Sequence, residues 1–215
     1  MAEHLKRAMF GAGGHAVSVL DALTIAGSPP ALIIDDDPVK QGRQLGNIKV
    51  TGNLSLFSKA ELASYELIVA IAKNEVRKQI VSQLVQMGAR LCGVKHPSAI
   101  ISPMAVVDPT AQILAGVIVN AGAVVGAHAV LNTGCIVEHD SSVGPFAHVG
   151  PGAVLAGAVV LEEGAFVATG AKVCPFVKLG SWSTLGAGAV ALADIPAHAV
   201  AVGVPARITK GEPRK

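Results

Sequence analysis

A period of six residues in the C-terminal half of the chain most strongly limits what this chain can fold into. Every sixth position from residue 101 to residue 185 holds Ile, Leu or Val, fifteen positions in all. They are Ile101, Val107, Ile113, Val119, Val125, Leu131, Val137, Val143, Val149, Leu155, Leu161, Val167, Val173, Leu179 and Leu185. An α-helix has no six-residue period and a plain strand has a period of two, so the pattern predicts a solenoid of hexapeptide repeats.

In such a solenoid each hexad turns two side chains inward, one aliphatic and one small, and the others point outward. Three hexads close one triangular coil of 18 residues, and coils stack about 4.8 Å apart. The fifteen hexads therefore predict five coils of an all-β parallel β-helix. A narrow tube has no room for rings, which fits the low aromatic content of 3%.

Residues 1–95 alternate between short apolar runs and helical patterns. They predict strands at 5–10, 31–34, 48–50, 67–71 and 90–94, and helices at 17–26, 54–64 and 74–87. Alternation of this kind indicates a parallel sheet. The sequence therefore predicts an α/β, half-Rossmann-like domain at 1–95 and a β-helical domain with a C-terminal tail at 96–215.

A glycine turn follows the first predicted strand. Gly11, Gly13 and Ala16 match the G-x-G-x-x-A form of the dinucleotide fingerprint, and Asp35 lies about 20 residues further on. Such glycines let the backbone approach a phosphate at a helix N-terminus. A complete NAD site needs a second mononucleotide half, but this chain continues into the solenoid. A half-site for one nucleotide, such as a nucleotide-sugar, fits better; a tight turn that binds nothing is the alternative.

Polar residues at the ends of the predicted strands extend this candidate site. The candidate substrate contacts are Gly13, Gly14, His15, Asp35, Asp36, Asn74 and Arg77. The two aspartates either contact the ligand or form the turn at a strand end. Arg77 either binds a phosphate bidentately or is a solvated helix residue.

In the solenoid, His139 lies two residues past Val137, at a predicted corner that points outward. Acyl transfer from a thioester needs a base to take a proton from the incoming amine or hydroxyl, and His suits neutral pH. An acid must orient the base, and either Asp140 or Glu138 can do so. Adding one coil to His139 gives Gly157, whose N–H could stabilise the oxyanion. A corner glycine selected for a positive φ is the alternative, and is compatible with that role.

The combination of these motifs resembles one bacterial family. The Gly13-Gly14-His15 turn, the short α/β domain, the His96-Pro97 joint and the hexads are together similar to the sialic-acid O-acetyltransferase-like (NeuD/PglD type) family. The resemblance covers essentially the whole chain and implies a left-handed β-helix. It also implies that a nucleotide-sugar binds the N-terminal domain, while acetyl-CoA lies between neighbouring solenoids of a trimer. The best-known members have Glu after the histidine, where this chain has Asp140.

The resemblance also implies an acetyl-CoA site, formed by Asn132, His148, Gly157, Thr169, Gly203 and Pro205. Asn132 and His148 are expected to face outward on one flat side of the prism, opposite the corner that bears His139. If His139 and His148 act on one substrate, the site is shared between subunits. The basic residues Lys210, Arg214 and Lys215 either assist the CoA phosphates or form a solubilising end.

Several other classes of protein fit the sequence less well. Residues 113–131 are nearly uncharged, but their Gly, Asn and His residues recur in phase with the hexads, so we expect no membrane span. No secretion signal follows Lys6-Arg7, and no cysteine has a close partner, so a cytoplasmic location is expected. A net charge of +2 without a basic stripe gives no reason to expect nucleic acid. The spacings of His128, His139 and His148 do not suit the zinc site of gamma-class carbonic anhydrases, so no metal is expected.

The leading hypothesis is therefore acetyl-CoA-dependent N-acetylation of a nucleotide-linked amino sugar, as in bacterial glycan synthesis. O-acetylation of a sialic-acid-like sugar is the second possibility, and a non-catalytic nucleotide-sugar-binding regulator is a third. A homotrimer is expected as well. From residue 99 to residue 200 the only Lys or Arg residues are Lys172 and Lys178. Apolar outward surface favours a partner, and a three-sided prism suits threefold packing.

Overall fold

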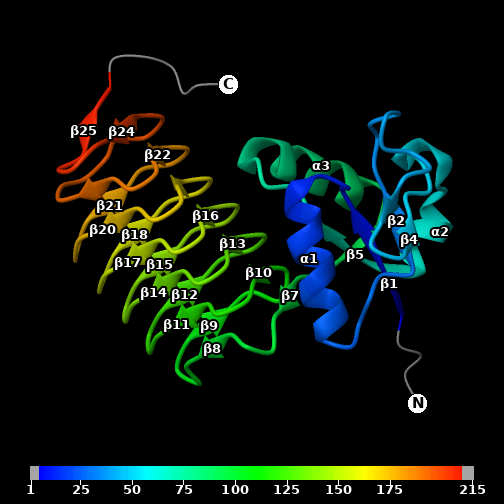
Figure 1. The fold of residues 1–215 in the computed structure, drawn as a ribbon, viewed down its shortest axis with the longest axis horizontal. Helices are drawn as coiled ribbons and strands as arrows, with labels where there is room; N and C mark the ends of the chain where they lie inside the picture. The colour runs from blue at the N-terminus through cyan, green and yellow to red at the C-terminus, as the bar shows by residue number, and fades with distance from the viewer. Residues whose placement is uncertain (1–4, 210–215) are drawn as a thin grey trace. The chain divides into compact units, whose positions relative to one another are not determined.

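A computed structural model describes residues 5–209 of the chain (Figure 1). The chain divides into two compact units, Met1–Pro97 and Ser98–Lys215. Lys210, Arg214 and Lys215, the predicted basic tail, lie outside the described residues. No helix within residues 5–209 is long and apolar enough to cross a membrane.

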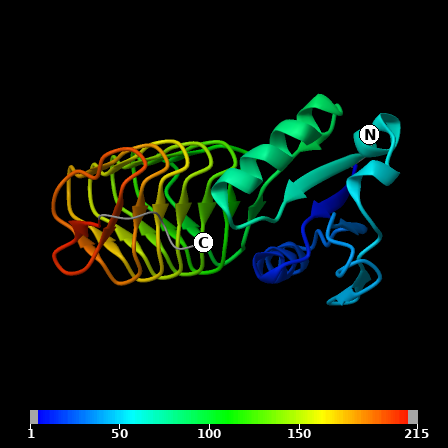
Figure 2. The ribbon, with the colours of Figure 1, turned by 90° about the horizontal axis from the view of Figure 1, so that it is seen from above.

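The first unit is built on a four-stranded parallel sheet with the order β2-β1-β5-β6. Its strands are β1 (Lys6–Phe10), β2 (Leu32–Ile34), β5 (Tyr65–Val69) and β6 (Arg90–Leu91). The helices α1 (Gly14–Ile25) and α3 (Asn74–Gln86) lie on opposite sides of these strands (Figure 2). The parallel α/β architecture predicted from the sequence is thus confirmed. The remaining elements are β3 (Gln44–Leu45), β4 (Ile48–Lys49), η1 (Leu54–Leu56), α2 (Lys59–Ala63) and β7 (Val94–Lys95).

The element boundaries differ from the prediction in ways that local chemistry explains. The single helix predicted at 54–64 is wrong, because Ser58 starts a new helix there. Its side chain accepts a hydrogen bond from the Glu61 N–H, and Glu61 bonds back to the Ser58 N–H. This capping box separates the 3₁₀ turn η1 from α2. At the end of α3, Gly88 takes the left-handed conformation with φ +79°, which is typical of a helix C′ position.

The second unit is a parallel β-helix whose coils stack from β8 to β24 (Figure 1). The first sheet contains β10 (Gln112–Ile113), β13 (Val130–Leu131), β16 (His148–Val149), β19 (Phe166–Val167), β22 (Thr184–Leu185) and β24 (Val200–Val202). The second contains β8 (Ile100–Ile101), β11 (Ile118–Val119), β14 (Ile136–Val137), β17 (Val154–Leu155), β20 (Lys172–Val173) and β23 (Val190–Ala191). The third contains β9 (Val106–Val107), β12 (Val124–Val125), β15 (Ser142–Val143), β18 (Val160–Leu161) and β21 (Lys178–Leu179).

The hexad pattern predicts the core of this unit residue by residue. All fifteen predicted aliphatic residues are the second residues of strands β8 to β22, and those from Ile113 onward are buried. The solenoid extends to about six coils, one more than the five predicted. The last coil carries Ala191 and Ala201 in the aliphatic slots, so a search for Ile, Leu or Val stops at Leu185. The strand β25 (Arg207–Ile208) pairs antiparallel with β24 and ends the first sheet.

The turns between the sheets form continuous corners along the solenoid. The first corner joins the first sheet to the second and includes residues 132–134 and 168–170. The second corner joins the second sheet to the third and includes residues 120–122, 138–140 and 156–158. Because strands of successive coils pair with an offset of 18 residues, as Ile136 does with Val154, corner residues of the same phase form columns.

Candidate active site

His139 and Asp140 form the turn at the second corner, between β14 and β15. The Nδ1 atom of His139 lies 2.9 Å from Oδ2 of Asp140, and both side chains are largely exposed, at 64% and 69%. The other predicted acid, Glu138, instead accepts a hydrogen bond at 2.7 Å from the side-chain amide of Asn120. Of the two acids, therefore, Asp140 is the one placed to orient the ring.

Gly157 lies one coil after His139 on the same corner, and the imidazole ring packs directly against it. A Cβ atom added to Gly157 would lie 2.7 Å from both Cε1 and Nε2 of His139, which is closer than real Cβ contacts allow. Gly157 is not in the left-handed region; the residue with positive φ at this turn is Ala158, at +56°. The need for a glycine here is therefore steric, and the alternative of a glycine selected for positive φ is wrong.

The residues predicted to bind acetyl-CoA, apart from Gly157, lie at or near the first corner instead. Asn132 and Thr169 lie on this corner, and the chain from Gly203 to Pro205 connects β24 to β25 beyond it. The side-chain amide of Asn132 lies 3.1 Å from Nε2 of His148. His148 alternates with the inward Val149, as predicted, but its side chain is 6% exposed and lies against the ring of Phe166, with ring centroids 5.1 Å apart.

The two groups of solenoid residues are separated within one chain. His148 belongs to the first sheet, whereas His139 lies at the corner between the second and third sheets. In a three-sided prism that corner is opposite the first sheet. One solenoid therefore does not bring these two histidines together.

In the α/β unit, Gly13 and Gly14 are glycines that the fold itself does not require. Neither has a positive φ, and a Cβ atom added to either would meet no atom within 4 Å. Gly11 is different: its φ is +111°, and an added Cβ would lie 2.8 Å from the carbonyl oxygen of Ala70. Gly14 starts α1 and His15 follows in its first turn, and the N-cap Gly13 supplies no side-chain hydrogen bond. The structure thus leaves open space where the sequence predicts a phosphate.

Asp35 and Asp36 follow β2 but have different surroundings. The buried carboxylate of Asp35 accepts hydrogen bonds from the N–H groups of Ala12 at 2.7 Å and Asp37 at 2.9 Å, and it pairs with Lys40 at 3.1 Å. It thereby ties the end of β2 to the glycine turn. Asp36 is exposed, and one of its oxygens accepts a hydrogen bond at 2.7 Å from the N–H of Leu54.

Arg77 is fully buried and bonded to its own segment of the chain. Its guanidinium donates to the carbonyl oxygens of Ile71 at 2.9 Å and Ala72 at 3.0 Å, and to the side-chain oxygen of Asn74 at 2.9 Å. Burial lowers the pKa of Arg77 to about 10. These contacts fit a residue that holds the segment after β5 better than one that binds a ligand.

Comparison with known proteins decides the family. Residues 6–84 match the model of the PglD N-terminal domain family. One similar structure is a His-to-Asn mutant of perosamine N-acetyltransferase from Caulobacter crescentus, solved in complex with CoA and GDP-perosamine. Its sequence is 34% identical to this chain, the TM-score is 0.90, and the match covers 96% of this chain and 97% of that chain. The acetyltransferase domain of PglB from Neisseria gonorrhoeae FA1090, in complex with acetyl coenzyme A, is 32% identical, with a TM-score of 0.86 over 96% and 100% of the two chains. The chain belongs to the NeuD/PglD-type family of sugar acetyltransferases.

As a member of the NeuD/PglD-type family, the chain is an acyltransferase with an α/β N-terminal region and a left-handed β-helix. WeeI from Acinetobacter baumannii AYE, at 23% identity and a TM-score of 0.84, shares the fold. The resemblance, fold class and enzyme class predicted from the sequence are confirmed. Within residues 5–209 no cluster of three or more His, Cys, Asp or Glu side chains could hold a metal ion.

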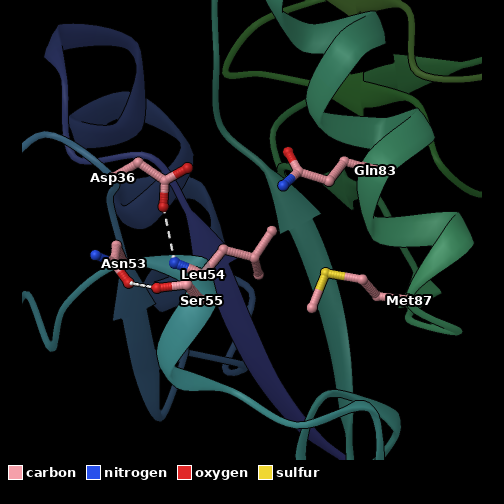
Figure 3. Close-up of a pocket in the computed structure, with 6 residues that line it drawn as sticks. All are labelled: Asp36, Asn53, Leu54, Ser55, Gln83 and Met87. Atoms are coloured by element: carbon pink, nitrogen blue, oxygen red, sulfur yellow. Dashed lines mark hydrogen bonds between the residues drawn. The ribbon is translucent and has the colours of Figure 1, made fainter.

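The structure also shows a pocket in the α/β unit, and only one of its lining residues, Asp36, is predicted from the sequence. It has a volume of about 330 Å³ and is lined by Asp36, Asn53, Leu54, Ser55, Gln83 and Met87 (Figure 3). In Figure 3 the side chains of α3 face those of the 53–55 segment across this space. Only Asp36 carried a sequence signal, because it follows a strand. The others come from segments that meet through the fold, without any motif.

Proposed function

We propose that this protein transfers the acetyl group of acetyl-CoA to the amino group of a nucleotide-linked amino sugar, with His139 as general base. The observation that carries the proposal is the geometry of His139. Its Nδ1 atom contacts Asp140 at 2.9 Å and its ring lies against Gly157. A proton held on Nδ1 by the carboxylate leaves Nε2 as the free acceptor. The solved relatives with CoA and with GDP-perosamine support the two substrate classes.

The reaction follows from these positions. The substrate amine attacks the thioester carbonyl carbon while Nε2 of His139 takes one of its protons, and the carbonyl oxygen becomes an oxyanion. We propose that the Gly157 N–H, for which no hydrogen bond within the described residues is seen, stabilises this oxyanion. Collapse of the intermediate breaks the C–S bond, and the CoA thiolate leaves with the proton that His139 holds. The products are the N-acetyl sugar and CoA.

We propose the carboxyl edge of the α/β sheet as the nucleotide site. The chain leaves β1 through the glycine turn and leaves β5 through residues 71–74, and these neighbouring strands carry helices on opposite sides of the sheet (Figure 2). This is the topological switch point at which parallel sheets bind ligands. The open space at Gly13 and Gly14 suits a diphosphate at the start of α1, with His15 beside it. Asp36 extends this edge into the pocket of Figure 3.

We propose that acetyl-CoA lies along the first corner of a neighbouring copy, in a homotrimer. Asn132, Thr169 and the 203–205 loop follow this corner in one line, and Asn132 is paired with His148. Because His139 is on a different corner, a single complete site needs two chains. Exposed apolar side chains on the solenoid, including Ile100 at 66% and Val106 at 64%, provide surface for such packing. Light scattering tests this: a monomer at micromolar concentration would contradict the shared site.

The proposed function is tested by mixing the protein with acetyl-CoA and a panel of UDP-, GDP- and dTDP-linked amino sugars, and measuring release of the CoA thiol. Each amino sugar is paired with the same sugar carrying a hydroxyl in place of the amine. Thiol release with the amino form alone is expected, and NMR of the product should show an amide. Release with the hydroxyl form would indicate O-acetylation. Binding of both ligands without thiol release from any mixture would instead indicate a non-catalytic regulator.

A further inference from the structure

The second corner places the candidate catalytic pair between two glycines. Three successive turns of the same phase are Ala121–Gly122, His139–Asp140 and Gly157–Ala158. Backbone hydrogen bonds fix their register: the Asp140 N–H donates to the carbonyl oxygen of Ala121 at 3.1 Å, and the Ala158 N–H donates to that of His139 at 2.9 Å. The pair is therefore held between one coil before it and one coil after it.

The two side chains of the pair lean in opposite directions along the solenoid axis. The ring of His139 leans toward Gly157, where an added Cβ would lie 2.7 Å from Nε2. The carboxylate of Asp140 leans toward Gly122, where an added Cβ would lie 2.5 Å from Oδ1 and 3.5 Å from Cγ. Real Cβ atoms essentially never come within 3.0 Å of another heavy atom. Each side chain therefore occupies space that any residue other than glycine would take.

The backbone conformation does not account for Gly122. Its φ is +73°, a value that favours glycine, but the same position in the following three coils is held by Asp140, Ala158 and Phe176 with φ between +56° and +64°. This corner therefore accepts side chains in the left-handed conformation. Gly122 differs from the residues at the same position in the following coils because the carboxylate of Asp140 lies against it.

We infer that Gly122 is a positioning residue for the acyl transfer, and that together with Gly157 it provides the space that seats the His139–Asp140 pair. The inference rests on the proposed function of His139. With Oδ1 of Asp140 placed over Gly122, Oδ2 reaches Nδ1 of His139 and fixes the tautomer that leaves Nε2 free. A methyl group at residue 122 displaces this exposed carboxylate and breaks that contact. The tube itself is unchanged, because residue 122 lies on the outside.

The test compares Gly122→Ala with Gly116→Ala. Gly116 has a φ of +67°, but an added Cβ there meets its nearest atom at 3.8 Å, so this variant carries the backbone strain without the clash. We expect Gly122→Ala to lose about tenfold in kcat with little change in KM, and Gly116→Ala to keep both. The two variants should unfold at similar temperatures.

A double mutant separates positioning from an unrelated effect. If Gly122 acts through the carboxylate, Asp140→Asn combined with Gly122→Ala should be no slower than Asp140→Asn alone. Additive losses, or a wild-type kcat in Gly122→Ala, would overturn the inference. Nitrogen-15 NMR of the imidazole provides a readout independent of turnover: the Nδ1–H tautomer should dominate for His139 in the wild type and in Gly116→Ala, and weaken in Gly122→Ala. If the tautomer of His139 changes in this way but the protein transfers no acetyl group, the proposed function is contradicted. The conclusion that Gly122 provides space for the Asp140 carboxylate would then still hold.

Discussion

The two units of the chain place their polar groups under opposite physical constraints. In the solenoid, the candidate catalytic pair, His139 and Asp140, lies on an outer corner, and the core behind it is a tube of aliphatic and small side chains. In the α/β unit, Asp35 and Arg77 are buried and hold together the loops that frame the candidate nucleotide site. We therefore expect that charges on the solenoid surface can be changed without loss of the fold, whereas a change of the buried charges at the sheet edge destabilises the fold. Substitutions in the two units should therefore differ in whether activity or stability is lost first.

The largest effect should come from His139→Ala. Removal of a general base commonly costs about 10² to 10⁴ in rate, so kcat should fall by that factor while the Kd values of both substrates stay nearly constant. The melting temperature should not change, because the ring packs only on the outside of the tube. His198→Ala, another exposed histidine with a positive φ on the solenoid, is the matched control and should keep full activity. Turnover within about threefold of wild type in His139→Ala would refute the assignment, and His148 would become the next candidate.

In the α/β unit, Arg77→Ala should act first on stability. The change removes the donor of three hydrogen bonds, one of them to the buried Asn74, and opens a cavity, so the free energy of unfolding should fall by about 2–4 kcal/mol in urea. Gln79→Ala, at an exposed position of the same helix, should cost less than about 0.5 kcal/mol. If Arg77 instead contacts the phosphate directly, the variant will lose nucleotide-sugar affinity at unchanged stability, and the contrast between the two units will fail.

Gly14→Val should weaken ligand binding while leaving the α/β fold intact. The new side chain has space within the chain but stands where the diphosphate is proposed to approach. Nucleotide-sugar affinity should fall by about tenfold or more in calorimetry, and acetyl-CoA binding should be retained. Equal loss of both ligands would indicate a folding defect, and unchanged sugar affinity would move the nucleotide elsewhere.

The smallest effect should come from Glu162→Gln on the surface of the solenoid. Hydrogen bonds from Lys178 and from Ser181 lower the pKa of Glu162 to about 2 from its ordinary 4.5. A lowered pKa means that the carboxylate stabilises the fold above pH 4.5 and loses this effect as the pH falls toward 2. Because the group lies at the surface and is only partly buried, the melting temperature at pH 7 should drop by only ~1–2 °C, and the difference between variant and wild type should shrink on acidification. A large drop would mean that the exposed charges of the solenoid stabilise its fold after all.

The sequence predicts the solenoid in detail because one period specifies which residues point inward, which form corners and which lie one coil apart. The contact between His139 and Gly157 follows from adding 18 residues. The same step back from Asp140 leads to Gly122, but a sequence does not tell which way an exposed side chain leans. Nor does the period show that Asp140, rather than Glu138, reaches the ring, because both are near it in the sequence.

The α/β unit is predicted less completely, since its site depends on tertiary contacts with no period. The ends of the predicted strands identify Asp35, Asp36 and Asn74 as candidate site residues. They do not show that the carboxylate of Asp35 accepts a hydrogen bond from the glycine turn, at the N–H of Ala12. Arg77 has the spacing of a ligand contact, yet burial turns its guanidinium toward backbone carbonyl oxygens. The pocket beside Asp36 brings the 53–55 segment to the far end of α3, a meeting that no local pattern encodes.

Columns of corner residues also determine how such a protein can change length in evolution. Gain or loss of a whole coil of 18 residues before Gly122 would leave the surroundings of the His139–Asp140 pair unchanged, because strands of successive coils pair at that spacing. Each such event would move His139 by about 4.8 Å relative to the first coil. The solenoid can therefore lengthen or shorten in whole coils while the contacts of His139 with Asp140 and Gly157 are kept.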